Sequence, residues 1–378
     1  MKVTYLGTYP PKECGIATFT RDLINAVESV SSRLKSEIVV VNQEEETYNY
    51  EPRVKIQINA NNLRQYLDLA LWVNNSNTEI VNIQHEFGIY GGLKGSYIIF
   101  FLKALKKPVI TTLHTVLPSP GPMEKTIIKN IADYSDYIVV MADKAVQILK
   151  YIYRIPENKI RTIPHGAPDV KPVAKDTLND FLSGYSDRVI LSTFGLISEG
   201  KGIEYAIMAM PDIVRRHPGV TYFIIGETHP EVRKKEGERY RLRLMRMVND
   251  LKLKNHVKFH NRYLTLRELI RYLQATSVYI TPYLNPNQIT SGTLAYALSC
   301  GKACVSTPYL YAREMLADGK GILTRFRDPE SISRAVNRIL DDEALRKRME
   351  KRAYNFSRRM IWTNVGRQYL NLFRETLK

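Results

Sequence analysis

VILSTFGLISEGKGIEYAIMAMPDIVRR, residues 189–216, contains one complete strand–loop–helix unit. Its first six residues, 189–194, form a short apolar run that is typical of a buried strand. A glycine-rich loop follows at 195–202, and residues 203–216 have the pattern of a helix. A short apolar run that leads through a loop into a helix predicts one unit of a parallel sheet with helices on its faces.

The same alternation of apolar runs and helix-length segments continues in both directions along the chain. The runs that predict strands are 2–6, 37–41, 79–83, 108–112 and 137–141 in the first half, and 189–194, 221–225, 256–259, 277–281 and 303–306 in the second. The segments that predict helices are 16–30, 203–216, 238–251, 265–275, 291–300 and 329–340. The whole chain therefore reads as an α/β protein with parallel, doubly wound sheets.

The length of 378 residues exceeds what one hydrophobic core usually supports, so we expect two domains. Residues 168–187 are rich in Pro, Asp, Ser and Lys, which is the composition of a linker. We expect two Rossmann-like doubly wound domains that face a central cleft, with residues 1–170 in the first and 171–358 in the second. Ligands of such sheets bind at the carboxyl ends of the strands.

The composition is that of an ordinary folded protein, with 44% hydrophobic and 25% charged residues, which excludes disorder, collagen and coiled coil. The three cysteines, Cys14, Cys300 and Cys304, are too few for a disulfide framework and favour a reducing compartment. No stretch approaches the ~18 apolar residues of a membrane span, and the start, MKVTYLGTYPP, lacks the apolar region of a signal peptide. We therefore expect a cytoplasmic location.

The positive charge is concentrated in the second half of the chain. Residues 1–170 contain 19 basic and 17 acidic side chains, whereas residues 171–378 contain 36 and 21. A basic surface attracts nucleic acid, acidic lipid or a phosphorylated small molecule. No nucleic-acid-binding motif accompanies the charge, so we expect no nucleic-acid partner. The densest basic run, 233–241, is more typical of a solvated helix face.

Three polar loops in the first half contain candidate site residues. Gly15 begins a helix, where free backbone amides favour anions, although an ordinary turn would use the same glycine. His85 and Glu86 follow one predicted strand, and His114 follows the next. Each imidazole is open to two interpretations, a ligand contact at the strand end or a buried structural histidine.

Two loops in the second half favour a phosphate site. Ser291 is a predicted N-cap, with Gly292 and Thr293 in the first turn of the helix, so that the amides there form a positive end suited to a diphosphate. Lys201 lies beside the start of another predicted helix and supplies the kind of point charge that phosphate sites use. An ordinary capped helix remains the alternative.

A metal site is not expected. The sequence contains no HExxH and no CxxC, and the Cys300-x3-Cys304 spacing has no histidine beside it.

These motifs, taken in order, resemble those of glycosyltransferase family 4, whose members are retaining enzymes of the GT-B fold. Residues 111–115, TTLHT, resemble the family's T-x-H strand end, whose His contacts the donor sugar. Lys201-Gly202 resembles its K-G pair, whose Lys binds the donor diphosphate. Gly15 falls where the family has its N-terminal glycine-rich loop.

The resemblance covers nearly the whole chain. Residues 163–166, IPHG, resemble the family's I-P-N-G turn before the second domain. Residues 297–305, ALSCGKACV, resemble its E-A-x-A-x-G-x-P-V-V segment, and Glu314 follows where a Glu is expected. The segment around Trp362 resembles the last helix of the family, so residues 359–378 are expected to cross back onto the first domain.

Three positions depart from the family pattern. The family's E-x7-E pair, which contacts the donor sugar and the ribose, is Gln288 and Tyr296 here. The family's diphosphate-binding Arg, five residues before the Lys, is Leu196 here. One cationic contact is therefore missing, and Lys201 and the helix amides would have to make the remaining contacts with the diphosphate. The Gln and Tyr resemble a bacterial and archaeal branch of the family.

The resemblance implies a retaining glycosyltransferase that moves a hexose from a nucleotide-diphosphate sugar to a carbohydrate or lipid-linked acceptor. It requires no metal ion and no cofactor besides this co-substrate. Peripheral contact with the inner membrane face would suit a glycolipid acceptor and a basic surface. By this resemblance the site residues are His114 and Gln288 as catalytic groups, Gly15, Lys201, Ser291, Gly292, Thr293, Tyr296 and Glu314 as donor-binding groups, and His85 and Glu86 as acceptor-binding groups.

Two other functions remain open. One is a sugar-nucleotide epimerase of the GT-B fold, which would need paired acid and base carboxylates. A pyridoxal-phosphate phosphorylase of this fold is not among them, because it would need a much longer chain. A non-catalytic sugar- or nucleotide-binding partner subunit is suggested by the replacement of the E-x7-E pair.

Overall fold

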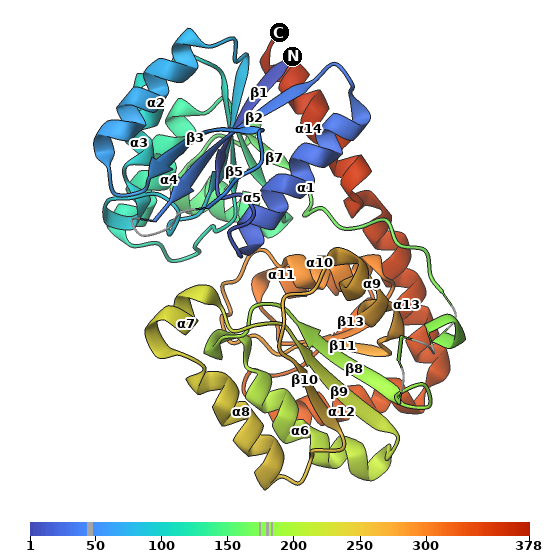
Figure 1. Cartoon of the computed structure of the whole chain (residues 1–378). Coiled ribbons are helices and arrows are strands. Elements are labelled where there is room, and N and C mark those ends of the chain that lie inside the picture. Colours follow the sequence, from blue (N-terminus) through green and yellow to red (C-terminus); the bar gives the residue numbers. More distant parts are fainter. Residues whose placement is uncertain (44–47, 174, 179–180, 183) are drawn as a thin grey trace. The chain divides into compact units, whose positions relative to one another are not determined.

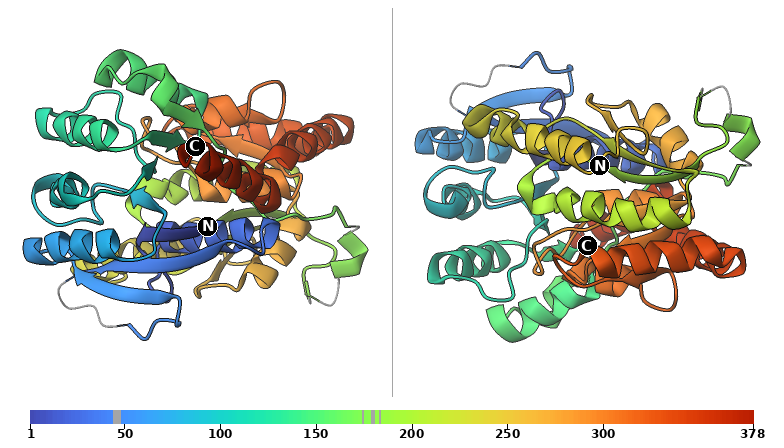
Figure 2. Two further views of the ribbon diagram at one scale, coloured as in Figure 1. Left: turned by 90° about the horizontal axis from the view of Figure 1, so that it is seen from above. Right: turned by 90° about the horizontal axis from the view of Figure 1, so that it is seen from below.

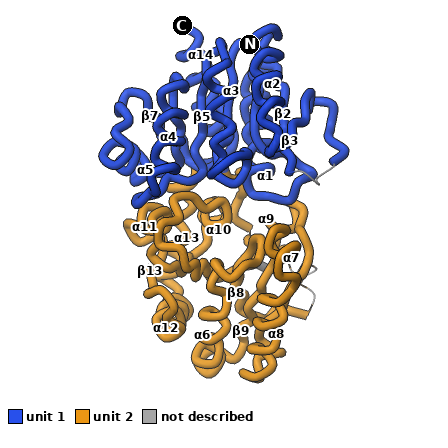
Figure 3. The backbone as a smooth tube through the Cα atoms, turned by 90° about the vertical axis from the view of Figure 1, so that its left-hand side faces the viewer, with its two compact units in different colours: residues 1–166, 359–378 blue, residues 167–358 orange. Residues whose placement is uncertain are grey.

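The computed structural model describes residues 1–43, 48–173, 175–178, 181–182 and 184–378, and it divides the chain into two compact units (Figures 1 and 3). Unit 1 comprises Met1–Gly166 and Arg359–Lys378, and unit 2 comprises Ala167–Arg358. The first border lies after Gly166, where the sequence predicted residue 170, and the second lies after Arg358.

Unit 1 is built, in its described residues, on one seven-stranded parallel sheet of order β3-β2-β1-β4-β5-β6-β7. The strands are β1 (Lys2–Gly7), β2 (Lys35–Asn42), β3 (Val54–Asn59), β4 (Ile80–His85), β5 (Val109–Leu113), β6 (Tyr137–Val140) and β7 (Ile160–Thr162). The helices are α1 (Gly15–Val30), α2 (Leu63–Asn75), α3 (Ile98–Ala104), α4 (Pro122–Tyr134), α5 (Asp143–Ile148) and α14 (Trp362–Thr376), with shorter helical turns η1 (Leu93–Gly95), η2 (Leu149–Tyr153), η3 (Glu157–Lys159) and η6 (Arg358–Met360).

The C-terminal helix α14 packs against α1, although the two are at opposite ends of the chain (Figure 1 and the left view of Figure 2). Tyr369 and Phe373 of α14 share one buried cluster with Phe19 and Leu23 of α1. The backbones approach closely at Gly366, because a Cβ there would lie 2.5 Å from the carbonyl oxygen of Ala26. The end of the chain thus belongs to unit 1.

Unit 2 forms, across its described residues, a six-stranded parallel sheet of order β10-β9-β8-β11-β12-β13. The strands are β8 (Val189–Phe194), β9 (Val220–Ile225), β10 (Val257–His260), β11 (Val278–Thr281), β12 (Ala303–Ser306) and β13 (Gly321–Leu323). The helices are α6 (Ile203–Arg216), α7 (Pro230–Glu236), α8 (Arg239–Asp250), α9 (Leu266–Ala275), α10 (Gly292–Ser299), α11 (Leu310–Met315), α12 (Pro329–Asp341) and α13 (Glu343–Ser357), with the short turns η4 (Lys175–Leu178) and η5 (Glu199–Lys201).

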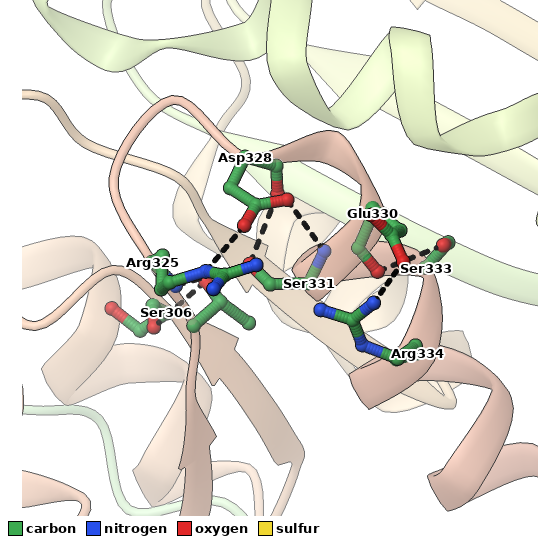
Figure 4. Close-up of polar contacts among 8 residues, drawn as sticks. Ser306, Arg325, Asp328, Glu330, Ser331, Ser333 and Arg334 are labelled. Atoms are coloured by element: carbon green, nitrogen blue, oxygen red, sulfur yellow. Dashed lines mark hydrogen bonds and ion pairs between the residues drawn. The ribbon is translucent and has the colours of Figure 1, made fainter.

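Some of the helices begin at a side chain that caps them, among them α1, α2, α9, α10, α12 and α13. Asp328 caps α12, because its Oδ1 accepts the Ser331 amide at 2.8 Å while Arg325 Nε donates to its Oδ2 at 2.5 Å (Figure 4). Pro329 occupies the first turn, where its missing N–H costs nothing. The cap and the Arg325 contact join the start of α12 to the loop that follows β13.

Both sheets reverse their strand order in the middle, and this reversal locates the site. In unit 1 the chain turns back between β1 and β4, and in unit 2 between β8 and β11. Connections from two adjacent strands run in opposite directions at such a point and leave a crevice at the carboxyl ends of the strands. The loops after β1, β4, β8 and β11 are therefore the places to look for ligand-binding residues.

The structure confirms the predicted fold class and corrects details of it. Each predicted strand is present, with ends that differ by no more than two residues. The edge strand β3, the three-residue strands β7 and β13 and the helices α7, α11 and α13 were missed, and no residue ranges were predicted for α2 to α5. The linker predicted at 168–187 is wrong in part, because Leu178 and Leu182 are buried in a small apolar cluster with Phe223. Residues 174, 179–180 and 183 of that segment lie outside the described residues.

Candidate functional site

Unit 2 brings Lys201 and the N-terminus of α10 together at its crevice. The Lys201 ammonium lies 4.1 Å from the centre of the Tyr283 ring, in the loop after β11. The Tyr283 hydroxyl is 2.8 Å from Thr293 Oγ1, which is 3.1 Å from Ser291 Oγ. One continuous set of contacts therefore links a lysine from the β8 loop to the first turn of α10.

Two glycines allow these loops to approach so closely. Gly202, directly after Lys201, has φ +61°, and a Cβ there would lie 2.2 Å from the Pro282 carbonyl oxygen. Gly195 has φ +131°, and its Cβ would lie 3.2 Å from Thr293 Cγ2. Side chains at either position would separate the β8 loop from the β11 loop and from α10.

The N-terminus of α10 is capped as its sequence predicts. Ser291 Oγ accepts the Leu294 amide at 3.3 Å, so Gly292 is the first residue of the helix. The partial positive charge of this helix end and the Lys201 ammonium are of the same sign. No carboxylate among the described residues is within ion-pair distance of Lys201. An anion, and above all a diphosphate, would be attracted to both groups.

The other donor residues predicted in unit 2 lie around α10 but are differently exposed. The Gln288 amide donates to the Thr290 carbonyl at 3.0 Å, within the same loop. Tyr296 is only 8% exposed, and its ring centre lies 6.4 Å from that of Phe194. Glu314 lies in α11 and is partly buried. Packing accounts for most of the Tyr296 surface, so its contact with ribose stays a prediction.

In unit 1 the predicted His114 follows β5 and is held by an amide from β4. Its Nε2 lies 2.9 Å from Gln84 Oε1, and its ring meets Phe19 edge-on at a centroid distance of 4.9 Å. Burial lowers the pKa of the His114 imidazole to about 3, with smaller contributions from His165 and His85. His114 is therefore a neutral imidazole at physiological pH.

Two further aromatic side chains surround Phe19. The rings of His165 and Trp362 lie 5.1 and 5.4 Å from it, so the IPHG turn and the start of α14 meet at α1. Gly166 is required there, because a Cβ would lie 2.2 Å from the Trp362 ring. Burial lowers the pKa of His165 to about 4. The ring of His114 thus packs against Phe19, which itself contacts the rings of His165 and Trp362.

The two predicted acceptor residues differ in their access to solvent. His85 is fully buried, and neither ring nitrogen has a hydrogen-bond partner in the described part of the chain. The predicted contact between His85 and an acceptor does not agree with this burial. Glu86 is partly exposed, and its carboxylate accepts hydrogen bonds from Thr115 Oγ1 at 2.5 Å and from the Phe87 amide at 2.9 Å. Burial raises the pKa of Glu86.

Gly15 is the first residue of α1, as predicted. The cap in front of it is Cys14, whose Sγ lies 3.2 Å from the Ala17 amide and 3.2 Å from Thr8 Oγ1. A Cβ at Gly15 would meet no atom within 4 Å. The space beside Gly15, where a side chain would lie, is therefore open within unit 1.

Sequence reasoning missed two kinds of residue in these clusters. Tyr283 is an aromatic side chain just after β11, and no motif marks it. Asn82 and Gln84 are amides inside an otherwise apolar strand, and that irregularity was the available signal. A buried amide must find partners, so its presence in a core strand points to a network.

Within the described ranges, no group of three or more His, Cys, Asp and Glu side chains is arranged to hold a metal ion. None of the helices described has both the length and the apolar character needed to cross a membrane.

Each half of the chain matches a glycosyltransferase family model. Residues 15–169 match the family described as Glycosyltransferase Family 4, and residues 176–356 match Glycosyl transferases group 1. The border between the two matches falls close to the border between units 1 and 2.

Two curated relatives have similar sequences. An uncharacterized glycosyltransferase of Methanocaldococcus jannaschii is 26% identical over 255 residues, which are 66% of this chain and 61% of that protein. A phosphatidyl-myo-inositol mannosyltransferase of Mycolicibacterium smegmatis is 24% identical over 277 residues, which are 72% of this chain and 66% of that protein. The matches thus span less than two thirds of the length of either relative.

Solved structures share the fold over the full length. Sucrose-phosphate synthase from Thermosynechococcus elongatus has a TM-score of 0.79 at 15% identity and covers 99% of each chain. HepE from Anabaena, in complex with UDP, has a TM-score of 0.77 at 15% identity and covers 99% of this chain and 100% of its own. The two family models and these neighbours together support a glycosyltransferase of the GT-B fold.

Proposed function

We propose that the chain transfers a hexosyl group, with retention of its anomeric configuration, from a nucleoside-diphosphate sugar to a carbohydrate or glycolipid acceptor in the cytoplasm. The observation that carries the proposal is the Lys201–Tyr283–Thr293–Ser291 cluster, in which a cation and a helix N-terminus converge. Both groups favour the charge of a diphosphate. The family resemblance supplies the retaining stereochemistry.

The chemistry of transfer explains why such a cluster would accelerate it. When the bond between the anomeric carbon and the diphosphate oxygen breaks, negative charge builds up on the departing diphosphate. Lys201 and the α10 amides are fixed before the reaction begins, so they stabilise this charge without reorganisation. Leu196 occupies the position at which the family has a second cation, so Lys201 would contribute a larger part of the charge that stabilises the diphosphate.

The proposed donor-binding groups in unit 2 are Lys201, Ser291, Gly292 and Thr293, with Gln288 beside the reacting sugar and Tyr296 and Glu314 near the nucleoside. In unit 1 the neutral His114 would hold a hydroxyl of the sugar, and Gly15 would receive an anionic group. Glu86 would hold an acceptor hydroxyl. The likeness to HepE, which was solved with UDP and with UDP-glucose, supports a uridine nucleotide among the donors to be tested.

The test is a panel of UDP-, GDP- and ADP-sugars, incubated with the purified protein and with mixed carbohydrate and lipid acceptors. We expect one donor class to give nucleotide release together with a product heavier than the acceptor by one sugar residue. If a nucleotide sugar binds in a calorimetric titration but neither release nor product is found, the chain is a binding subunit. If none binds, the assignment of unit 2 fails.

A further inference from the structure

Two buried amides on β4 form a hydrogen-bonded relay behind His114. Asn82 and Gln84 are two residues apart in the strand, so their side chains lie on the same face of the sheet. Both residues are 0% exposed. Buried amides of this kind are costly unless every polar atom is satisfied, so the contacts they make are specific.

The relay runs from a backbone carbonyl to the imidazole in three steps. Asn82 Nδ2 donates to the carbonyl oxygen of Ile110, on the neighbouring strand β5, at 3.1 Å. Gln84 Nε2 donates to Asn82 Oδ1 at 2.6 Å. Gln84 Oε1 lies 2.9 Å from His114 Nε2.

The carbonyl at one end fixes the direction of every bond in the relay. A backbone carbonyl can only accept, so Asn82 must turn its NH2 group toward Ile110 and its oxygen toward Gln84. Gln84 must then turn its own NH2 group toward Asn82 and its oxygen toward His114. An amide oxygen can only accept, and therefore Nε2 of His114 carries the hydrogen. In a neutral imidazole the other nitrogen, Nδ1, is then an acceptor.

We propose that Gln84, oriented by Asn82, is a positioning residue that fixes His114 in its Nε2–H form and leaves Nδ1 to accept a hydrogen bond from a hydroxyl of the transferred sugar. The ligand part of this proposal rests on the proposed function. No described residue forms a hydrogen bond with His114 Nδ1, and the residue is partly exposed.

The arrangement has a chemical consequence for recognition. A fixed acceptor nitrogen selects a ligand group that can donate, such as a sugar hydroxyl, and discriminates against a keto or carboxylate oxygen at the same place. The ring stays neutral, because burial lowers the pKa of His114 to about 3. The titratable groups around it are His85 on β4, His165 beyond β7, and Glu86, which reaches the neighbouring Thr115.

The first experiment needs no variant of the relay. The protein is labelled with ¹⁵N-histidine, the His114 signals are assigned by their loss in His114→Phe, and the ring nitrogens are observed from pH 7.5 to 5. We expect a protonated Nε2 and an unprotonated Nδ1 over the whole range. A protonated Nδ1 at pH 7, alone or with Nε2, would overturn the proposal.

Two variants of Gln84 then test the relay itself. Gln84→Met removes the acceptor at similar volume, and we expect a mixture of the two neutral forms of His114. Gln84→Glu places a carboxylate beside Nε2, which stabilises the imidazolium, so Nδ1 should become protonated at a higher pH than in the wild type. Gln57→Met, on the edge strand β3, is the matched control and should leave the His114 signals unchanged. Unchanged signals in both Gln84 variants would show that the relay does not orient the ring.

The ligand part is tested with UDP, UDP-glucose and GDP-mannose as probes. A nucleotide sugar should shift the Nδ1 signal of His114, whereas UDP alone should not. Gln84→Met should weaken the binding of that nucleotide sugar in proportion to the fraction of His114 that loses the Nε2–H form, about twofold for an equal mixture, and leave UDP binding unchanged. If the nucleotide sugars bind without moving Nδ1, the contact is refuted although the donor assignment stands. If none of the three probes binds, the proposed function fails, while the first experiment still decides which ring nitrogen of His114 carries the hydrogen.

Discussion

Replacing Lys201 by Ala should weaken the binding of a nucleoside diphosphate without preventing it. The Lys201 ammonium lies over Tyr283, 4.1 Å from the ring centre, and no described carboxylate competes for it, so its charge is available to a ligand. A charge-assisted hydrogen bond contributes about 1.5–3 kcal/mol, which corresponds to a loss of about tenfold to more than a hundredfold in affinity. The N-terminus of α10 remains in the variant and should retain the residual binding.

Calorimetric titration with UDP and with uridine separates the diphosphate contact from the rest of the nucleotide. Lys201→Ala should weaken UDP and leave uridine unchanged. Lys235→Ala, which removes an exposed positive charge from α7, controls for the net charge of unit 2. Lys201→Met keeps an aliphatic chain against Tyr283 and should match Lys201→Ala in UDP affinity but melt closer to the wild type. A UDP affinity within twofold of the wild type in both Lys201 variants would refute the assignment.

Three more predictions follow from the same clusters. Tyr296→Ala should lower the free energy of unfolding by about 3–5 kcal/mol, because Tyr296 is only 8% exposed, and thermal melting measures this packing role. Tyr296→Phe should weaken donor binding about fivefold if the hydroxyl contacts ribose, and calorimetry measures this binding role. Nucleotide release should survive EDTA, and its loss with recovery on adding magnesium or manganese would contradict a metal-free diphosphate site. Burial lowers the pKa of His85 to about 3, whereas the pKa of histidine in the unfolded chain is about 6.5. Between these two pH values the unfolded chain binds one more proton than the folded chain, so the free energy of unfolding decreases by about 1.4 kcal/mol for each unit by which the pH is lowered. His85→Phe should therefore lose about 2 kcal/mol less than the wild type between pH 6.5 and 5 in urea unfolding, and parallel losses would show that His85 does not titrate in this way.

The strand and helix pattern was predictable because the buried parallel strands are short apolar runs of β-branched residues. The strands that were missed do not have this signal. β3 alternates polar and apolar residues at the sheet edge, and β7 and β13 have only three residues each. The loop residues Lys201 and Ser291 were recognised from their places beside helix starts, and the structure brings them together through Tyr283.

The arrangement on β4 was not predictable from adjacency in sequence. His85 and Glu86 were interpreted together because both follow an apolar run. Side chains alternate along a strand, so Gln84 lies on the face that carries Asn82, whereas His85 lies on the opposite face. This alternation explains why Gln84 reaches His114 while the His85 ring is buried beside Tyr90. Which amide meets which imidazole depends on the pairing of β4 with β5, and the sequence does not contain that register.

The central claim, that the chain moves a hexose and keeps its anomeric configuration, is tested most directly by the glycosidic linkage of the product. Once the donor panel has identified a nucleotide sugar and an acceptor, the one-bond carbon–proton coupling at the anomeric centre of the purified product can be measured by NMR. The account predicts the same anomeric configuration as in the donor, formed with one nucleoside diphosphate released per linkage. A product of inverted configuration, or nucleotide release without a new glycosidic linkage, would contradict it.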